Sequence, residues 1–167
     1  MSKYPSDFPP GVPPERQSEL PPELQSEDPA EPPREPLVLQ HIEGPLAVLE
    51  LNRPHKRNAI SLAMVSELER CVSGLPASVR VIILAARGEH FSAGLDLSEI
   101  PEMSAAQGVH HSHAWYQVFD KLQFGRVPVI CVMHGAVVGG GLELASCAHV
   151  RIADDTAYFG LPEGQRG

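Results

Sequence analysis

Three consecutive glycines followed by a single carboxylate form the segment of this chain whose residue types could most directly do chemistry. Gly139-Gly140-Gly141 precede a run with helical spacing, and Glu143 falls in its first turn. The N–H groups that open a helix lack intrahelical acceptors, and the helix dipole adds partial positive charge there. Because glycine lets a ligand atom approach such groups closely, the segment can bind an oxyanion. Tight packing of a helix on a strand would explain the glycines equally well.

The better-known glycine motifs do not fit this segment. Its spacing, with Gly135 before the three glycines, is not the GxGxxG of dinucleotide-binding folds. A phosphate-binding P-loop needs a lysine where Leu142 stands, and the GxSxG of a nucleophile elbow is absent from the sequence.

A second glycine-containing loop favours the oxyanion interpretation. Residues 89–98 contain Ser92-Ala93-Gly94-Leu95 and, like the triple glycine, follow an apolar run typical of a buried strand. Two such loops at the ends of neighbouring strands can direct two backbone N–H groups at one point. That arrangement is an oxyanion hole, built without charged side chains.

Alternating strand and helix patterns must position these loops. Ser61 is a plausible N-cap for a helix that Gly74 ends, and residues 105–124 form a longer helix with Trp115 among its inward-facing side chains. The predicted strands are 37–42 and 46–51 as a hairpin, then 81–86, 127–134 and 149–153, with a helix over 142–147 and a further element from Tyr158. Segments 81–86 and 127–134 are apolar enough for strands buried on both faces. The alternation predicts an α/β fold with substantial parallel pairing.

Four segments, in this order, carry a family resemblance. Asn52-Arg53-Pro54 with Asn58-Ala59 resembles the first characteristic loop of the crotonase superfamily, and residues 91–97, 134–145 and 159–163 are similar to its three signatures. The members it resembles most are enoyl-CoA hydratases and isomerases. The resemblance runs over residues 37–167. It implies an α/β, ClpP/crotonase-like spiral of β-β-α units that lacks the C-terminal helices with which the family closes its acyl pocket and builds trimers.

The resemblance implies a role for each matching residue. The N–H groups of Leu95 and Gly140 would hold the thioester carbonyl of an acyl-CoA, and Glu143 and Glu163 would position water and move protons. Residues that would line the CoA channel are Ala59, Ala93, Asp96, Leu97 and Ser98, and Lys56 and Arg57 are candidates for the CoA phosphates. On the residues alone, a carboxylate that stabilises its helix N-terminus is the favoured interpretation of Glu143, and only the resemblance, with Glu163, favours a catalytic role.

The reaction that this resemblance implies is addition of water across the α,β double bond of an enoyl-CoA, a lyase reaction of fatty acid metabolism. An isomerase, an acyl-CoA hydrolase and a non-catalytic scaffold remain alternatives on the same fold. No cofactor is implied, because coenzyme A is part of the substrate, and a homotrimer or hexamer is the assembly expected of the family.

Residues 1–36 differ in composition from the rest of the chain. They hold eleven of the 17 prolines and eight acidic against three basic residues. Such a segment cannot bury enough apolar surface to offset its ordering entropy, so we predict a disordered, acidic, Pro-rich tail before a crotonase-like core over 37–167. A solubilising role is favoured over a polyproline ligand.

Charge and composition narrow the partners and the compartment. A net charge of −8 disfavours nucleic acid and anionic membrane surfaces. The sequence shows neither an apolar run of membrane-spanning length nor a secretory or mitochondrial leader pattern. Cys71, Cys131 and Cys147 lack CxxC spacing, which is typical of buried, reduced thiols in a cytoplasmic protein. His110 and His113 could share a helix face, but without a suitably spaced Glu or Cys a metal site is not expected.

Overall fold

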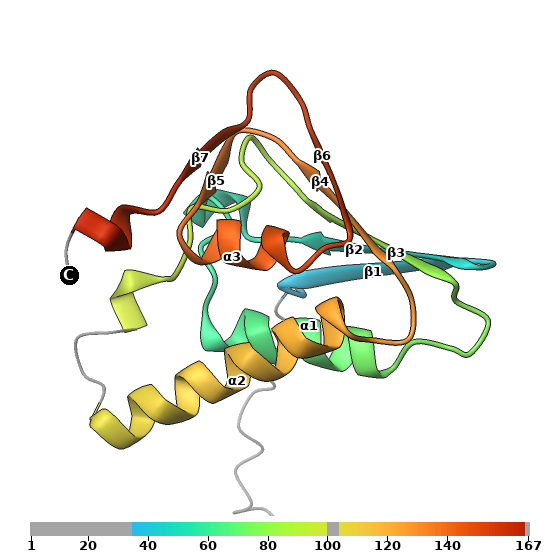
Figure 1. The fold of residues 1–167 in the computed structure, drawn as a ribbon, viewed down its shortest axis with the longest axis horizontal. Coiled ribbons are helices and arrows are strands. Elements are labelled where there is room, and N and C mark those ends of the chain that lie inside the picture. The colour runs from blue at the N-terminus through green and yellow to red at the C-terminus, as the bar shows by residue number, and fades with distance from the viewer. Residues whose placement is uncertain (1–34, 100–103, 166–167) are drawn as a thin grey trace, which may run out of the picture. The chain divides into compact units, whose positions relative to one another are not determined.

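The computed structural model describes residues 35–99 and 104–165 (Figure 1). The predicted tail therefore lies almost wholly outside the described residues. The strands are β1 (Val38–Glu43), β2 (Leu46–Leu51), β3 (Val81–Ala86), β4 (Val129–Met133), β5 (Ala136–Val138), β6 (Val150–Ala153) and β7 (Tyr158–Gly160), and the α-helices are α1 (Leu62–Ser73), α2 (Ala105–Gln123) and α3 (Gly140–Ser146). The predicted α/β class is confirmed, and every predicted element is present within a few residues of its expected bounds.

One five-stranded sheet, in the order β1-β2-β3-β4-β6, carries the fold. β1 and β2 form the predicted antiparallel hairpin around Gly44, whose φ of +55° suits glycine. From β2 onward every pair is parallel, with Leu49 opposite Leu84 and Leu84 opposite Cys131. Parallel strands end at the same edge, so the loops that follow β3 and β4 come together.

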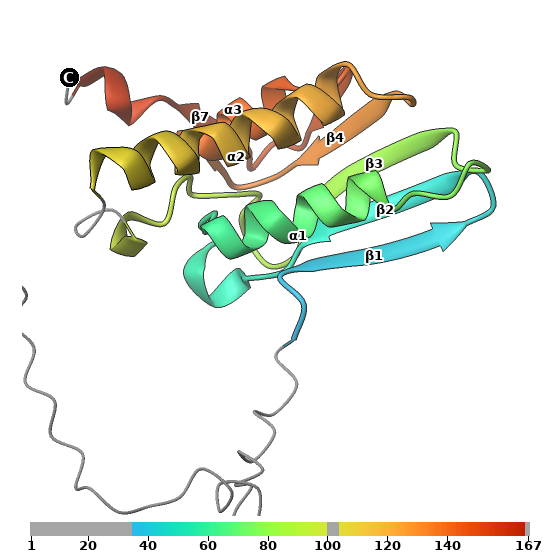
Figure 2. The same cartoon turned by 90° about the horizontal axis from the view of Figure 1, so that it is seen from below.

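Helices α1 and α2 supply the crossover connections, and both lie on the same face of the sheet (Figure 2). α1 begins at the predicted cap, because Ser61 Oγ accepts a hydrogen bond from the Met64 N–H at 3.2 Å, and it ends at Gly74. α2 begins with a capping box between Ser104 and Gln107. Its buried side chains, Trp115 among them, face the core as predicted.

The opposite face of the sheet is less buried than the sequence predicts. β3 and β4 alternate, with Leu84 and Cys131 fully buried while their neighbours Ile83 and Ile130 are half-buried. The expectation that both strands are buried on both faces is therefore wrong for this chain. The reason is that α1 and α2 cover one face, and within residues 35–99 and 104–165 no helix covers the other.

A second, two-stranded parallel sheet stands apart from the main one and was missed in the sequence. β5 runs beside β7, with Val137 opposite Phe159, and α3 follows β5 directly (Figure 1). The loop after β3 joins this small sheet through a parallel bridge between Ser92 and Val137. The small sheet therefore fixes the glycine-rich segment against that loop.

The described residues add three facts about partners and compartment. No helix among them is long and apolar enough to cross a membrane. Cys131 and Cys147 are buried as predicted, and burial raises their thiol pKa values to about 12 and about 11. In the part of the chain that the structure describes, no cluster of three or more His, Cys, Asp or Glu side chains could hold a metal ion.

Candidate active site

The two glycine-containing loops meet at the start of α3. A methyl group placed on Gly140 would lie 3.6 Å from the Leu95 nitrogen, and one placed on Gly94 would lie 3.4 Å from the Gly140 nitrogen. The loop that holds Leu95 and the start of α3 at Gly140 therefore lie in close contact. The sequence-predicted pair, Leu95 and Gly140, lies side by side across this contact.

Backbone pairing leaves both N–H groups available to a ligand. In the bridge between Ile60 and Leu95, the hydrogen bonds run from Ile60 N–H to the Gly94 carbonyl and from Asp96 N–H to the Ile60 carbonyl. The Leu95 N–H therefore points away from Ile60. Gly140 is the first residue of α3, where an N–H group has no intrahelical acceptor. Among the described residues, no backbone acceptor pairs with either group.

The position of α3 depends on glycine for steric reasons. A side chain at Gly94 would lie 2.8 Å from the Val138 carbonyl oxygen, and the φ of Gly94 is +94°, where other residues are strained. A methyl group on Gly140 would lie 2.8 Å from Trp115 Cη2. The glycines therefore allow close packing and also leave the N–H groups accessible. Tight packing and oxyanion binding, the two interpretations of the glycines in the sequence, are compatible.

The small sheet brings the segments of the two glutamates to the same place. Gly139 N–H donates to the Gly160 carbonyl at 2.8 Å, and α3 starts at the next residue. Glu143 lies in the first turn of α3, and Glu163 lies in the 3-10 helix Pro162–Gln165 that follows β7. The pairing of β5 with β7 thus brings together the segments of Glu143 and Glu163, which are 20 residues apart in the sequence. The side chain of Glu163 lies outside the described part of the structure.

A cavity of about 650 Å³ opens beside these groups, between α2 and α3, and we call it the α2–α3 cavity. Its apolar walls and its carboxylate come from Leu95, Trp115, Phe119, Leu142, Glu143 and Leu161. Glu143 has an exposed side chain within this lining. The cavity therefore presents one carboxylate and one of the two predicted donors to whatever fills it.

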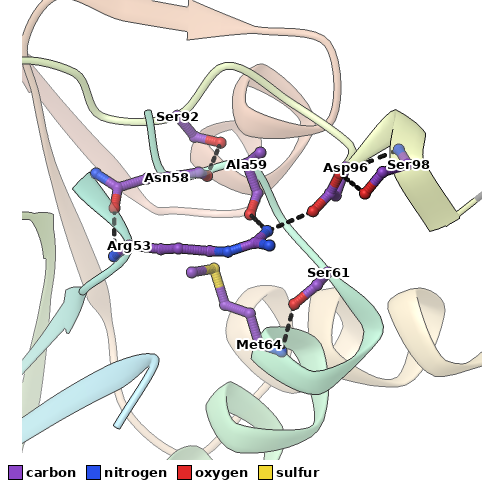
Figure 3. Close-up of polar contacts among 8 residues, drawn as sticks. All are labelled: Arg53, Asn58, Ala59, Ser61, Met64, Ser92, Asp96 and Ser98. Carbon is purple, nitrogen blue, oxygen red and sulfur yellow. Dashed lines mark hydrogen bonds and ion pairs between the residues drawn. The ribbon is translucent and has the colours of Figure 1, made fainter. Parts of the chain in front are cut away.

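A polar network with a buried centre holds the loop of Leu95 in place, and we call it the loop clasp: Arg53, Asn58, Ser92, Asp96 and Ser98 (Figure 3). Arg53 Nη1 donates to Asp96 Oδ2 at 2.6 Å and to the Ala59 carbonyl at 3.0 Å. Asn58 is fully buried, and its Nδ2 donates to the carbonyls of residues 87 and 90, each at 2.8 Å. Ser92 Oγ donates to the Asn58 carbonyl at 2.8 Å.

Asp96 is the ionised centre of the loop clasp. Its side chain is only 7% exposed, and its Oδ1 accepts a hydrogen bond from Ser98 Oγ at 2.6 Å. The Ser98 hydroxyl, followed by the Arg53 guanidinium, lowers the pKa of Asp96 to about 2 against the opposing effect of burial. Both oxygens of the Asp96 carboxylate are already hydrogen-bonded to Arg53 and Ser98, so this carboxylate holds the loop in position. Arg53, Asn58 and Ser92 lie in segments that carry the family resemblance, but no role at the site was predicted for them.

The remaining residues predicted for the CoA channel lie on the loop before α1 and on the loop after β3. Ala59 is half-buried, Ala93 is exposed, and Leu97 and Ser98 are exposed in the 3-10 helix Leu97–Glu99. These residues stand outside the lining of the α2–α3 cavity. Lys56 and Arg57 are exposed on the adjoining loop.

Comparison with known proteins gives consistent matches over the described fold. The family model described as enoyl-CoA hydratase/isomerase matches residues 41–167. A short-chain-enoyl-CoA hydratase of Clostridium acetobutylicum is 35% identical over 129 residues, which cover 75% of this chain and 49% of that protein. A crotonyl-CoA hydratase of Syntrophomonas wolfei is 35% identical over 124 residues, covering 72% of this chain and 48% of that protein.

The structural match agrees with the sequence match. The crystal structure of an enoyl-CoA hydratase from Thermoplasma volcanium has a TM-score of 0.75 to this chain at 33% identity, covering 80% of this chain and 54% of that one. The chain spans about half the length of the curated relatives that it matches.

Proposed function

This chain belongs to the enoyl-CoA hydratase/isomerase family, and on that premise we propose that the protein adds water across the α,β double bond of an enoyl-CoA thioester. The observation that supports the proposal is the close approach of the Leu95 loop to Gly140, beside a cavity that Leu95 and Glu143 both line. Chemistry at the α carbon of a thioester passes through an enolate-like oxyanion. Two preorganised donors stabilise that charge where it develops, and one such donor is typically worth about 10²–10³-fold in kcat.

The reaction divides between two carboxylates in this proposal. The thioester oxygen binds between the N–H groups of Leu95 and Gly140. One glutamate takes a proton from water as the water oxygen bonds to the β carbon, and the other delivers a proton to the α carbon. Glu143 and Glu163 are the pair, supported by the β5–β7 pairing that brings their segments together.

Isomerisation of the double bond is the second candidate. Among the described residues that line the α2–α3 cavity, Glu143 is the one carboxylate. A single carboxylate suffices to carry a proton from one carbon of the acyl chain to another. Isomerisation therefore needs Glu143 and both N–H donors but no second glutamate.

The coenzyme A end of the substrate is proposed to lie along the two loops. Ala59, Ala93, Leu97 and Ser98 border the Leu95 donor, and exposed Lys56 and Arg57 offer positive charge to phosphates nearby. Asp96 is proposed as a positioning residue, because its carboxylate is already bonded within the loop clasp. No further cofactor is needed, since coenzyme A arrives with the substrate.

Assembly and compartment are proposals of the same kind. A homotrimer or hexamer and a role in fatty acid metabolism are proposed from the family resemblance, and a cytoplasmic location is proposed from the cysteines. The buried free thiols of Cys131 and Cys147 support a reducing compartment. The acidic net charge supports a protein that binds neither nucleic acid nor anionic membranes.

The test is hydration of crotonyl-CoA, followed as loss of the absorbance of the conjugated thioester. Glu143→Gln and Glu163→Gln are each expected to lower kcat by about 10²–10⁴-fold, the usual contribution of a general acid or base. Glu50→Gln is the matched control, because Glu50 lies on β2, outside the α2–α3 cavity, in a partly exposed ion pair with Arg87. Folded protein without hydration activity would refute the hydratase. Isomerisation of a 3-enoyl-CoA that needs Glu143 but not Glu163 would establish the second candidate.

A further inference from the structure

We infer that His90 is a positioning residue that joins the two loops of the candidate active site and so sets the relative place of the Leu95 and Gly140 N–H groups. The inference rests on the proposed function, because it takes these two groups as the donors to the thioester oxygen. The half-buried His90 lies in the loop after β3, five residues before Leu95. Its Nδ1 accepts a hydrogen bond from the Ala136 N–H at 3.2 Å, and Ala136 begins β5, four residues before Gly140.

The imidazole takes the place of a backbone acceptor between this loop and β5. At the parallel bridge that Ser92 makes with β5, the Ser92 N–H donates to the Ala136 carbonyl at 2.9 Å, and the Val138 N–H donates to the Ser92 carbonyl at 3.1 Å. A regular parallel ladder would continue from the Ala136 N–H to the carbonyl of His90. That carbonyl accepts from Asn58 Nδ2 at 2.8 Å, and the His90 ring accepts from Ala136.

Close packing at the start of β5 makes this acceptor hard to replace. A methyl group placed on Gly135 would lie 2.6 Å from His90 Nδ1 and closer still to the Glu89 carbonyl oxygen. Ala136 itself is only 2% exposed. A buried N–H group that loses its acceptor bears the full cost of its desolvation. We therefore expect the loop and β5 to shift relative to one another when the Nδ1 acceptor is removed.

His90 connects the loop clasp to the strand that leads into α3. Its carbonyl is bonded to Asn58 of the loop clasp, and its ring is bonded to Ala136. Both donors follow within five residues of these contacts, Leu95 on the loop and Gly140 at the start of α3. A shift between the loop and β5 therefore changes the separation of the donors. A displacement of about 1 Å at a reacting centre can cost about 10²-fold in rate.

The contact also fixes the tautomer of the ring. Nδ1 can accept from an N–H group only when the ring proton is on Nε2. The ¹⁵N NMR spectrum of the wild-type protein at mildly alkaline pH distinguishes a bare ring nitrogen from a protonated one. We expect a bare Nδ1 for His90, and a ring with its proton on Nδ1 would overturn the inference without the need for any variant.

The chain contains a matched control for the loss of this contact. His149 Nδ1 accepts from the Val129 N–H at 3.1 Å, and Val129, like Ala136, is buried. Val129 begins β4, at the opposite edge of the sheet from the two loops. His90→Phe and His149→Phe therefore each remove one imidazole acceptor from a buried strand N–H, but only His90→Phe does so between the loops. His90→Asn is the conservative variant, because the asparagine Oδ1 can take the place of Nδ1.

The first comparison of these variants needs no substrate, because it follows the backbone amide NMR signals of Leu95 and Gly140 in the free protein. We expect both signals to move in His90→Phe, to keep their positions in His149→Phe, and to return toward their wild-type positions in His90→Asn. Hydrogen exchange at Ala136 should become faster in His90→Phe alone. Leu95 and Gly140 signals that keep their positions in His90→Phe, or that move equally in His149→Phe, would overturn the inference.

Hydration of crotonyl-CoA then separates this inference from the proposed function. In His90→Phe we expect kcat to fall about tenfold to a hundredfold while KM changes less than about threefold, because the donors move and the rest of the binding surface does not. In His90→Asn we expect kcat to recover to within about threefold of the wild-type value, and in His149→Phe to stay unchanged.

The two proposals can fail independently. Amide signals that move as expected, in protein that hydrates no enoyl-CoA, would sustain the role of His90 and refute the hydratase. Hydration that His90→Phe leaves unchanged, or that His90→Phe and His149→Phe lower equally, would sustain the hydratase and refute the role of His90.

Discussion

The packing of Gly140 against Trp115 predicts what happens when a single methyl group is added at the start of α3. In Gly140→Ala, the new methyl would lie 2.8 Å from Trp115 Cη2 and 3.1 Å from Cζ3, closer than carbon atoms can approach without movement. Trp115 is only 8% exposed, so its ring must shift against packed neighbours or into the α2–α3 cavity to make room. Overpacking of this kind costs about 1–3 kcal/mol.

Gly108→Ala is the matched control for this change. Gly108 lies within the first turns of α2, and a methyl group placed there would meet nothing within 4 Å. Alanine in place of glycine inside a helix stabilises by about 1 kcal/mol, a gain that Gly108→Ala receives more fully than Gly140→Ala at the first residue of α3. The Tm of Gly140→Ala is therefore expected to lie below that of Gly108→Ala by about 4–12 °C, the size of shift that 1–3 kcal/mol gives in a domain of this length.

The same methyl group should also impair catalysis. It would lie 3.6 Å from the Leu95 nitrogen, at the point where the thioester oxygen is proposed to bind. A displacement of about 1 Å at a reacting centre can cost about 10²-fold, so kcat/KM for enoyl-CoA hydration should fall by that order in Gly140→Ala and stay unchanged in Gly108→Ala. Equal melting temperatures and equal activities in the two variants would refute the close approach of α3 to Trp115 and Leu95.

Three further predictions concern the supports of the site, and urea unfolding measures each of them. Asp96→Asn should lower the free energy of unfolding by about 2–4 kcal/mol, because it leaves the mostly buried Arg53 without its anion. Glu50→Gln, in a more exposed ion pair, should lower it by less than about 1 kcal/mol. Similar losses in the two variants would show that the loop clasp contributes no more than a surface pair. Because the folded pKa of Asp96 is depressed to about 2, its ionisation should stabilise the fold by about 2 kcal/mol above about pH 4, and this is lost as the pH falls toward 2. The stability difference between wild type and Asp96→Asn should therefore shrink over that range, and a constant difference would contradict the shift. Ser61→Ala removes the cap of α1 and should lower the free energy of unfolding by about 1 kcal/mol. Ser66→Ala, at an exposed position of the same helix, should change it by no more than about a few tenths of a kcal/mol. Equal effects of the two variants would refute the cap.

The periodic elements of this fold were accessible from the sequence because local rules determine them. Ser61 and Gly74 bound α1 as predicted, since a capping hydroxyl and a glycine stop act within one helical turn. The hairpin around Gly44 follows from two apolar runs and one turn. Burial of the outer sheet face was overestimated, because β-branched runs such as residues 81–86 have the same composition whether or not another layer covers them.

The site was accessible only in part. α3 begins at Gly140, two residues before the predicted start, because the Gly160 carbonyl holds the Gly139 N–H and so fixes the preceding residue outside the helix. A partner 21 residues away leaves no local signal. β5, with three residues, is too short to show a period of two. The loop clasp joins Arg53 to Asp96 across 43 positions, so its existence depends on the parallel sheet that brings the two loops together.

Residue types nevertheless indicated the chemistry. Glycines after a strand and before a helix limit the local structure to a few uses, and the second loop with Leu95 points to paired N–H groups. The structure adds the steric reason for the glycines, which is that a methyl group on Gly94 would clash with the Val138 carbonyl and one on Gly140 with Trp115. What no pattern shows is the cavity beside them, because its lining comes from four separate segments of the chain.

The central claim is that the N–H groups of Leu95 and Gly140 bind a thioester carbonyl oxygen, and the most direct test observes that carbonyl. Butyryl-CoA labelled with ¹³C at the carbonyl carbon cannot be hydrated, so its NMR signal reports binding alone. We predict that the signal moves downfield on binding, as two hydrogen bonds in a water-excluded site polarise the C=O bond. A bound carbonyl with the same chemical shift as free butyryl-CoA in water would contradict the account.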